Sequence, residues 1–474
     1  MSNDLRRTLS LQDSISMVAG NMIGCGIFLV SAETARIVNS AWLLLIVWLV
    51  AGLVSLVGAL AYGELAANIT DEGGQYMYLK KIYNDITAFS YGWTLFLVIQ
   101  TGSIAAICLA FAKFMGILIP YISNSIYLVS FALPWGGDFH ISVQQVCAIF
   151  VCIFLTYVNS RGVEYGVITQ NLFTVTKIIS LIAIIVCGIF FGLNWDVIHA
   201  NFPKGCMAIH LNDMHLIATA TVGALFAAIT WNNLTFIAGE IKEPEKNIPK
   251  AMVYGVGLVV ILYLLINAVY VYTVPLDAIK TAHDDIVAAS VMGAMFGKIG
   301  EMLIAVVLMI SSFGCANGMI LTGSRVYYKM AKDRLFFRNL AVINRRTKVP
   351  VNSLWSQGLW ICALVLFVGD YSAMLDFVIY INLIFYAITT FGIFIYRKKF
   401  PDAPKILRVN NILPILFIAS LVYIVGCLTV YKPAYTLPGL LITLAGLPVY
   451  YFWKKSKDKK SLNKTKQEGI IINK

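Results

Sequence analysis

The sequence alternates long apolar runs with short polar connections along almost its whole length. A run of about 20 apolar residues is long enough for an α-helix to cross the hydrocarbon core of a bilayer. Of the 474 residues, 59% are hydrophobic and 13% are charged, whereas soluble domains carry roughly 25% charged residues. We therefore predict an all-α membrane protein embedded in a lipid bilayer. The twelve predicted transmembrane helices cover residues 13–37, 41–68, 88–118, 142–158, 166–193, 214–241, 251–273, 297–328, 352–368, 371–396, 411–430 and 434–453.

The positions of the positive charges predict an orientation for these helices. With the N-terminus in the cytoplasm, most of the 36 lysine and arginine residues fall on the inner side, notably in the stretches 325–348, 397–408 and 454–474. Cytoplasmic connections of membrane proteins carry such an excess. We predict a multi-pass protein of the plasma (inner) membrane with both termini cytoplasmic. Its net charge of +12 is then explained by topology and lipid contact, so no nucleic-acid partner is expected. The cations expected outside are Arg36, Lys204, Lys280, Lys298 and Lys432.

Three glycines, Gly20, Gly24 and Gly26, interrupt the first predicted helix. Each lowers local helix stability by roughly 1 kcal/mol relative to alanine, and irregular backbone at membrane depth must be buried in protein or line a polar cavity. We predict that the helix unwinds here and lines a binding site near the membrane midplane. The alternative is that the glycines serve only close packing between helices.

A second interruption falls in the sixth predicted helix, where residues 229–234 read Ile-Thr-Trp-Asn-Asn-Leu. Threonine and asparagine are poor helix formers, and the amides need partners that lipid does not supply. Because helices 1 and 6 each begin a set of five, the spacing predicts a five-plus-five inverted repeat with broken helices 1 and 6. The predicted domains are a cytoplasmic N-terminus (1–12), a ten-helix transport core (13–396), two additional transmembrane helices (397–453) and a basic cytoplasmic tail (454–474).

The two ends created by a broken helix carry opposite partial charges. Free amide hydrogens at the start of the second half suit a carboxylate, and free carbonyls at the end of the first half suit an ammonium group. Two such breaks that meet at the midplane suit a zwitterionic α-amino acid. The acidic residues near the helix ends leave the breaks without a carboxylate for a cationic side chain, so we expect neutral substrates. These acids are Glu64, Glu164, Glu240, Glu301 and Asp376.

Lys177 lies near the middle of the fifth predicted helix. A lysine at that depth costs roughly 2.5–3.5 kcal/mol on insertion scales and usually serves function. The alternative is a structural tie to backbone carbonyls. Lys113, near the outer end of the third predicted helix, is instead expected to reach the membrane surface with its flexible side chain.

The cysteines and histidines form no recognisable site pattern. All nine cysteines except Cys206 lie inside apolar runs, and the five histidines lie in or beside connections; of these, His210 and His215 are expected to be polar surface residues. We expect no metal and no cofactor. An enzyme would need a nucleophile, a metal cluster or a carboxylate pair at the midplane, and a channel would need polar rings along a pore. The sequence offers neither, so no enzymatic activity is predicted.

Several motifs in order along the chain resemble the amino acid-polyamine-organocation superfamily. Residues 18–28, Val-Ala-Gly-Asn-Met-Ile-Gly-Cys-Gly-Ile-Phe, resemble its first-helix signature. Further stretches look like motifs of its second, fifth and sixth helices, and one on the eighth is similar to its L-type amino acid transporter branch. The resemblance covers about residues 10–450. The further stretches are 62–65 with Gly73 and Gly74, 173–177, 240–249, and 312–318 followed by Ser324 and Arg325.

This resemblance implies a substrate site and a coupling residue. Lys177 matches a lysine whose ammonium replaces a sodium ion of sodium-coupled relatives, which implies sodium-independent transport. Phe226 matches an aromatic gate over the substrate, and Asn232 stands where some polyamine-handling relatives carry an acid. The implied substrate-binding residues are Met22, Ile23, Gly24, Cys25, Gly26, Phe226, Ile229 and Asn232, with the carboxylate on the amides of Gly24 to Gly26 and the amino group on the carbonyls of Met22, Phe226 and Ile229.

Three features depart from the pattern or refine it. Cys25 stands where serine is common, and Ile229 and Thr230 are bulkier than the glycine often found there. Residues 119–141 contain no cysteine, whereas eukaryotic L-type carriers use one in this connection to hold a heavy chain, so a prokaryotic carrier without a heavy-chain subunit is expected. We predict a sodium-independent exchanger of neutral L-amino acids that works by alternating access. The alternatives are a proton-coupled symporter, in which Lys177 gains and loses a proton, and a membrane amino acid sensor.

Overall fold

The computed structural model describes residues 7–132, 138–203, 213–368, 371–402, 406–431 and 439–454. Within these ranges, 11 helical segments are long and apolar enough to cross a membrane, and they correspond to the first 11 predicted helices. The twelfth predicted helix is described only over residues 439–454, which are helical. Residues 1–6 of the predicted N-terminus, residues 455–474 of the predicted tail, Cys206 and His210 lie outside the described residues.

The helices alternate with short connections. The long helices are α1 (Leu11–Met22), α2 (Gly26–Val38), α3 (Ala41–Asn68), α5 (Asp85–Thr94), α6 (Gln100–Leu118), α7 (Val143–Ser160), α8 (Val163–Phe191), α10 (Asp213–Ala228), α12 (Pro244–Thr273), α14 (Val287–Lys332), α15 (Val351–Val368), α16 (Tyr371–Lys399) and α17 (Ile412–Tyr431). The short elements are α4 (Gln75–Ile82), α9 (Trp195–Asn201), α11 (Asn233–Phe236), α13 (Leu276–Lys280), the π-helical turn Leu95–Ile99, and the 3₁₀ turns Thr230–Asn232, Ala238–Glu240, His283–Asp285 and Arg338–Ala341.

Two elements differ from the expected helical pattern. Strand β1 (Tyr127–Ala132) pairs antiparallel with β2 (Asp138–Ser142) in the connection between α6 and α7. Its Tyr-Leu-Val-Ser-Phe sequence is rich in residues that favour strands, which an analysis limited to apolar runs of membrane length does not detect. Helix α14 begins ten residues before the predicted position 297, and Gly297 adopts φ 59° within it, so the backbone kinks where the predicted span starts.

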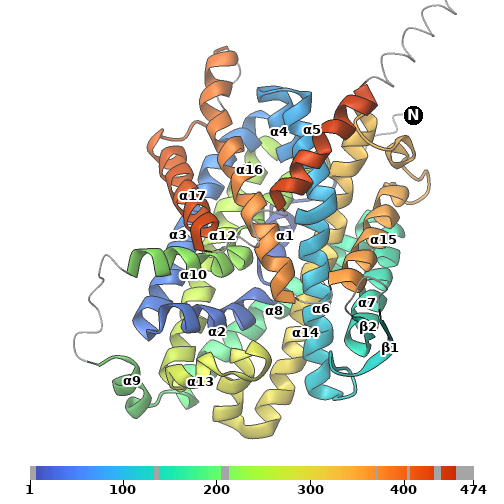
Figure 1. Cartoon of the computed structure of the whole chain (residues 1–474). Coiled ribbons are helices and arrows are strands. Elements are labelled where there is room, and N and C mark those ends of the chain that lie inside the picture. The colour runs from blue at the N-terminus through green and yellow to red at the C-terminus, as the bar shows by residue number, and fades with distance from the viewer. Residues whose placement is uncertain are drawn as a thin grey trace, which may run out of the picture.

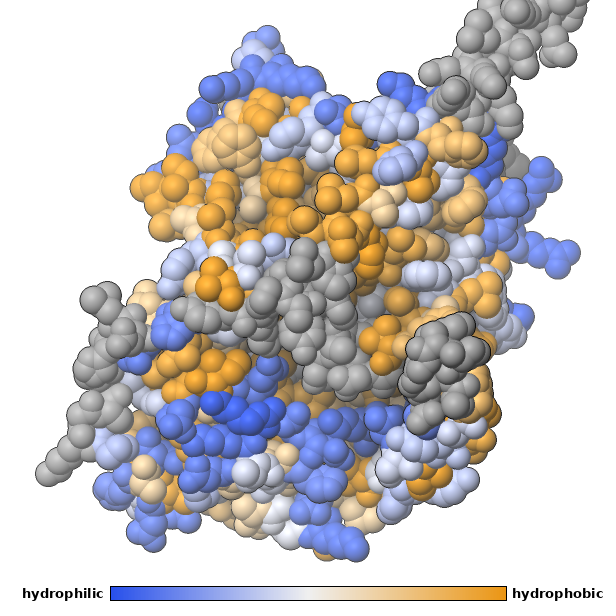
Figure 2. Space-filling view, in the orientation of Figure 1, coloured by the Kyte–Doolittle hydropathy of each residue, from blue (hydrophilic) through white to orange (hydrophobic). Residues whose placement is uncertain are grey.

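The two halves of the first predicted helix lie inside the bundle (Figure 1). Helix α1 packs on α8, α12 and α14, whereas α2 packs on α10. Helices α4 and α5 lie at one end of the molecule together with residues 439–454, and α9, α13 and the β-hairpin lie at the opposite end (Figure 1). Figure 2 shows a broad apolar area over α16 and α17 with hydrophilic residues above it. Exposed Leu416 and Val422 on α17 fit a surface that contacts lipid.

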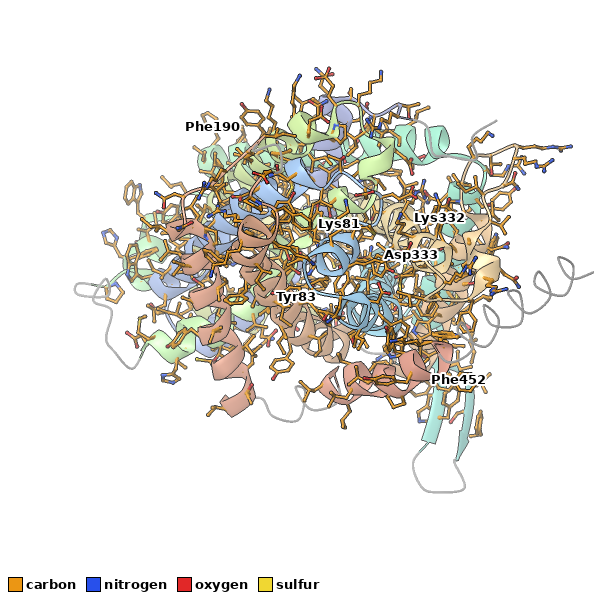
Figure 3. All side chains as sticks on the ribbon, turned by 90° about the horizontal axis from the view of Figure 1, so that it is seen from above. Lys81, Tyr83, Phe190, Lys332, Asp333 and Phe452 are labelled. Atoms are coloured by element: carbon orange, nitrogen blue, oxygen red, sulfur yellow. The ribbon has the colours of Figure 1, made fainter. Side chains whose placement is uncertain are left out.

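The end that carries α4 is rich in ion pairs. The ammonium of Lys80 lies 2.6 Å from a carboxylate oxygen of Asp333, and the same carboxylate accepts a 3.0 Å hydrogen bond from the phenol of Tyr76. Burial, together with the Asp333 carboxylate, raises the pKa of Tyr76 well above its usual value. Figure 3 shows Asp333 beside Lys332 at this end, with Lys81 nearby. These contacts join α4 to the end of α14.

The N-terminal segment pairs with the end of the sixth predicted helix. The backbone amides of Thr8 and Leu9 donate to the carbonyl of Glu240 at 2.9 and 3.0 Å, and the amide of Lys242 donates to the carbonyl of Leu9 at 2.9 Å. Ser10 then caps α1 in a reciprocal arrangement with Asp13. These hydrogen bonds therefore join the segment just before α1 to the segment that follows the second broken helix.

The position of Arg325 differs from the prediction, which placed this residue in a cytoplasmic connection. It is fully buried within α14, and its Nε donates a 2.8 Å hydrogen bond to the carboxylate of Glu240, which is 2% exposed. Glu64 is paired in the same way with Arg397, whose Nε donates across 2.7 Å. An apolar run can contain a buried ion pair because each charge supplies the partner that the other needs. Both carboxylates are therefore committed to arginines.

Candidate functional site

The first predicted helix is broken, as the glycines indicated. Helix α1 ends at Met22 and α2 begins at Gly26. Between them Ile23 adopts φ −73° and ψ 87°, which is not helical. The break is enclosed by protein, because Ile23 is 0% and Cys25 1% exposed.

The same glycines also allow close packing. A Cβ atom at Gly26 would lie 2.7 Å from the Cβ of Ala227, and one at Gly24 would lie 3.0 Å from the Sγ of Cys315. Such distances leave no room for a side chain at Gly26. The glycines therefore do both things that were considered: they interrupt the helix, and they allow close packing. The close packing brings the start of α2 against the end of α10.

Lys177 lies against the carbonyl end of α1. Its ammonium donates hydrogen bonds of 2.8 Å to the carbonyls of Gly20 and Ile23, and the residue is 1% exposed. A helix end has up to four carbonyls without intrahelical partners and a partial negative charge. The ammonium satisfies two backbone carbonyls at the break and places a positive charge there. This contact is the tie to backbone carbonyls that was the structural alternative for Lys177.

Side chains from other elements also bind the carbonyls of the last two residues of α1. The phenol of Tyr263 on α12 donates to the carbonyl of Met22 at 2.6 Å. The hydroxyl of Thr230 and the thiol of Cys315 donate to the carbonyl of Asn21 at 2.9 and 3.0 Å. Tyr263 was not identified from the sequence, although a phenol in the middle of an apolar run needs a partner and so gives a signal.

The second break lies at the predicted position. Helix α10 ends at Ala228, Ile229 adopts φ −111° and ψ 7°, and a 3₁₀ turn follows. The phenol of Tyr386 on α16 donates to the carbonyl of Ile229 at 2.6 Å. Each carbonyl oxygen has two lone pairs, so the carbonyls of Met22 and Ile229 each retain acceptor capacity beside the phenol they already bind.

One carbonyl at the end of α10 differs from its neighbours. The last turn presents four carbonyls, and those of Leu225 and Ala228 accept hydrogen bonds from the Ile229 amide and the Ser55 hydroxyl. The carbonyl of Ala227 has only a 3.4 Å contact with the Tyr263 phenol, whose single hydrogen is donated to Met22 at 2.6 Å. Within the described ranges, the carbonyl of Phe226 has no such partner. This oxygen is thus the acceptor at the second break with its full capacity available.

The amides at the start of α2 are also available. The first four amides of an α-helix have no intrahelical partner, and Cys25 at the N-cap position provides no side-chain cap. The amide of Phe28 closes a short turn by donating to the carbonyl of Cys25 at 3.1 Å. The start of α2 therefore presents the amide of Gly26 with the positive end of the helix dipole.

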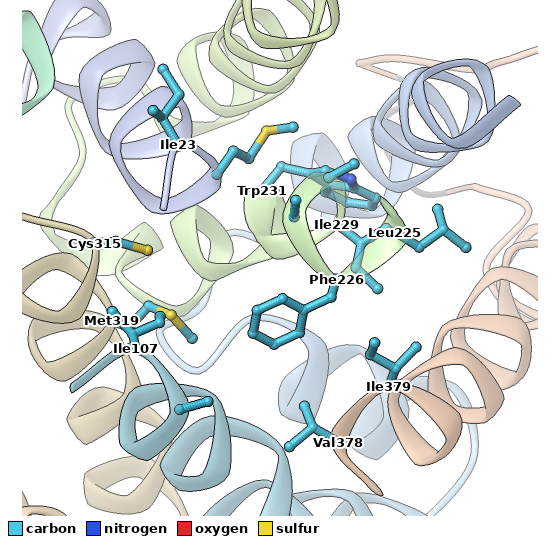
Figure 4. Packing of buried hydrophobic residues seen from close by; sticks show 14 of the residues in the cluster. Ile23, Ile107, Leu225, Phe226, Ile229, Trp231, Cys315, Met319, Val378 and Ile379 are labelled. Carbon is cyan, nitrogen blue, oxygen red and sulfur yellow. The ribbon is translucent and has the colours of Figure 1, made fainter. Parts of the chain in front are cut away.

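Phe226 lies beside the two breaks on α10 and is 7% exposed. Figure 4 shows its ring pointing from α10 toward Ile107 of α6 and Met319 of α14. Val378 and Ile379 of α16 lie on the other side of the same region (Figure 4). The ring is thus surrounded by side chains from three helices outside its own.

The side chain of Asn232 forms its hydrogen bond with Gln75 of α4 and not with the first break. Its amide donates to the Oε1 of Gln75 at 3.1 Å, and Gln75 in turn donates to the hydroxyl of Thr389 at 3.0 Å. Gln75 is fully buried and was not identified from the sequence, where it follows Gly73 and Gly74 with no periodic signal. The chain of contacts joins the second break to α4 and α16.

The residues around the two breaks offer hydrogen-bonding groups. In the ranges that the structure describes, no group of three or more histidine, cysteine or acidic side chains is placed to hold a metal ion. The site-lining groups identified above are main-chain amides and carbonyls, phenols, a lysine and apolar walls. Amides of this kind can donate to a carboxylate, and carbonyls can accept from an ammonium group.

Comparison with known proteins agrees with the motifs. The family model described as amino acid permease matches residues 9–451. The chain is 28% identical over 467 residues to the human large neutral amino acids transporter small subunit 2, and the match covers 95% of this chain and 81% of that protein. It is 29% identical over 460 residues to the serine/threonine exchanger SteT of Bacillus subtilis (strain 168), with 96% and 98% covered. It is 27% identical over 454 residues to the mouse b(0,+)-type amino acid transporter 1, with 95% and 88% covered. The chain therefore belongs to the amino acid permease family of the amino acid-polyamine-organocation superfamily, among relatives of the L-type branch.

Proposed function

We propose that this protein exchanges neutral L-amino acids across the plasma membrane by alternating access, without sodium. One observation carries the proposal. The Cβ position of Gly26 lies 2.7 Å from Ala227, so the amide end of α2 adjoins the carbonyl end of α10. A site in which an amide end and a carbonyl end adjoin matches the two charged groups that all α-amino acids share.

The carboxylate of the substrate binds the amide end of the first break. The donors are the backbone amides of Gly24, Cys25 and Gly26, and the dipole of α2 adds a partial positive charge. A side chain at Gly26 would push α10 away, so the glycine keeps the two breaks together. The thiol of Cys25 contributes less to the carboxylate than a serine hydroxyl would, because a thiol is a weak donor.

The ammonium of the substrate binds the carbonyls at the second break. The acceptors are the carbonyls of Phe226, Ile229 and Met22, and that of Phe226 has its full capacity available. Phe226 closes over the bound amino acid as a gate. Ile23 completes the site. Asn232, whose amide donates to Gln75, adds no negative charge at the second break, which favours neutral side chains.

Lys177 replaces a coupling cation in this mechanism. Its ammonium bonds to Gly20 and Ile23, so the carbonyl end of α1 already has a positive partner. A sodium ion at the same carbonyls would be repelled by that charge. Transport without sodium follows.

The wider organisation is proposed from the charge distribution and the relatives. Helices within residues 13–396 form the transport core, residues 397–453 add two helices, and both termini lie in the cytoplasm. The relatives include a protein named as a small subunit and a bacterial exchanger, and the connection 119–141 lacks a cysteine. We propose that the chain functions without a heavy-chain subunit and without enzymatic activity.

Proteoliposomes test the proposal directly. Vesicles preloaded with unlabelled serine, leucine or glutamine should accumulate the same labelled amino acid, with equal rates in sodium and potassium buffers, whereas empty vesicles should not. Uptake into empty vesicles driven by a pH gradient would replace the exchanger with a proton-coupled symporter. Saturable binding without accumulation in any condition would indicate a sensor. A panel of competing amino acids then defines the substrate range.

The position of the site has a test of its own. Cys25 is the thiol at the centre of the proposed carboxylate site, so a small thiol reagent should label it slowly and bound substrate should protect it. Labelling that substrate does not change would place the site elsewhere while leaving exchange itself intact.

A further inference from the structure

Four amide side chains form a cluster between α1, α7, α8 and α14, on the side of Lys177 that faces the start of α8. This amide cluster consists of Asn21, Asn159, Gln170 and Asn317, and each member is at most 1% exposed. Gln170 and Lys177 are separated by two turns of α8. Four fully buried amides in one place are unusual because amides are mostly exposed in proteins.

The amide cluster is only partly paired by protein groups. Asn159 donates to the Oδ1 of Asn317 at 2.8 Å, and Asn317 donates to the carbonyl of Gly166 at 3.1 Å. Within the described ranges, both side-chain polar atoms of Asn21, the Oδ1 of Asn159 and the Nε2 of Gln170 have no hydrogen-bond partner. Buried polar groups in native proteins are satisfied by protein or by ordered water, so these atoms call for a further ligand.

Two of these atoms lie close together beside a glycine. A Cβ at Gly318 would lie 2.1 Å from the Oδ1 of Asn21 and 2.8 Å from the Nε2 of Gln170. The acceptor and the donor are therefore at most about 5 Å apart, on either side of the position that a side chain at residue 318 would take. A water molecule that binds both at roughly 2.8 Å spans such a separation.

The mixture of groups selects the ligand. The amide nitrogens of Asn21 and Gln170 are donors, which disfavours a bare cation, and the oxygens of Asn21 and Asn159 are acceptors, which disfavours an anion. Water both donates and accepts. We propose that the amide cluster binds internal water molecules, which bridge α1 to α8 and α14.

This hydration has a consequence for the movement of α1. Alternating access requires helices to move against one another, and wherever the contact of α1 with α8 and α14 changes, direct hydrogen bonds across it would have to break. Water-bridged contacts change partners as the helix moves and keep the amides satisfied. This consequence rests on the proposed exchange function, whereas the water site itself does not.

A high-resolution cryo-electron microscopy map of the full chain in a lipid nanodisc, with a bound antibody fragment, tests the water site. We expect a density peak within hydrogen-bonding distance of the Oδ1 of Asn21 and the Nε2 of Gln170. Direct hydrogen bonds between these two amides, with no peak, would overturn the proposal. Neither result depends on transport activity.

A second measurement needs no map. Radiolytic hydroxyl-radical labelling oxidises side chains next to bound water, and Cys315 donates to the backbone of Asn21 although it is 2% exposed. We expect Cys315 to be oxidised several times faster than Cys108, which is equally buried in α6. In the Asn317→Leu variant the rate at Cys315 should fall severalfold while Cys108 is unchanged.

The matched control is Thr322→Val, on the same helix, whose hydroxyl donates to carbonyls of its own helix. It should leave the labelling of Cys315 unchanged. Equal rates at Cys315 and Cys108 in the wild-type protein, or an unchanged Cys315 rate in Asn317→Leu, would contradict the proposal. Where the variant fails to fold, the presence or absence of the density peak between Asn21 and Gln170 decides the proposal.

Discussion

The phenol of Tyr263 donates a 2.6 Å hydrogen bond to the carbonyl of Met22, the last residue of α1. Removing the hydroxyl in Tyr263→Phe leaves that carbonyl short of a buried donor, a loss of about 1–3 kcal/mol. We expect the exchange rate to fall roughly tenfold or more while the protein still inserts, as measured in proteoliposomes. Tyr272→Phe, near the C-terminal end of the same helix, is the control and should keep the wild-type rate.

The second prediction concerns Lys177. Lys177→Ala removes both hydrogen bonds to the break and the only charge that contacts these carbonyls in the described ranges. Exchange should be lost or fall by at least about 100-fold, because two buried carbonyls lose their partners, while weak substrate binding persists in a scintillation proximity assay. Lys113→Ala, on α6, should retain exchange. A wild-type rate in Lys177→Ala would return Lys177 to a purely structural role.

The third prediction separates gating from binding at Phe226. Phe226→Leu keeps an apolar side chain but removes the flat ring that spans the space between α10, α6 and α14. If the ring is a gate, the maximum exchange rate should fall more than the half-saturation concentration rises, because closure is impaired and the backbone contacts remain. Initial-rate measurements over a range of substrate concentrations give both quantities. A change in half-saturation alone would make Phe226 a wall of the pocket.

The fourth prediction uses a pair of glycines. Gly26→Ala places a Cβ 2.7 Å from that of Ala227, whereas Gly257→Ala on α12 meets nothing within 4 Å. The first variant should separate the two breaks and weaken substrate binding by tenfold or more, roughly the effect of losing one to two buried hydrogen bonds. The second should transport normally, with helix stability raised by up to about 1 kcal/mol. Equal binding by both variants would show that the breaks need not touch.

The fifth prediction concerns stability. Arg325→Met leaves the carboxylate of Glu240 buried without its cation, and breaking a buried pair from one side costs about 3–5 kcal/mol. The midpoint of thermal unfolding in detergent should fall clearly. The double variant Arg325→Met with Glu240→Leu should recover a large part of that loss, because neither charge is then left unpaired. No recovery would mean that Glu240 has a further role, such as ordering the N-terminal segment that pairs with its backbone.

Much of the fold follows from patterns that the sequence displays directly. Apolar runs of membrane length locate 11 helices, and the glycines and asparagines locate both breaks. The buried pair of Arg325 and Glu240 was not foreseen, because a charge at the end of an apolar run looks the same whether it faces water or a partner from a distant helix. The partners of the broken segments, Tyr263 and Tyr386, depend on how helices face one another, which a single sequence does not record.

The groups presented at the two breaks belong to the main chain, and this affects how such a site can change over evolutionary time. A substitution can alter the ring of Phe226 or the thiol of Cys25, but only proline removes a backbone amide, and no substitution removes a carbonyl. The contacts that we propose for the part that all amino acids share would thus be unaffected by most mutations. The walls are free to drift, so new substrate preferences can arise in this architecture without rebuilding its anchor.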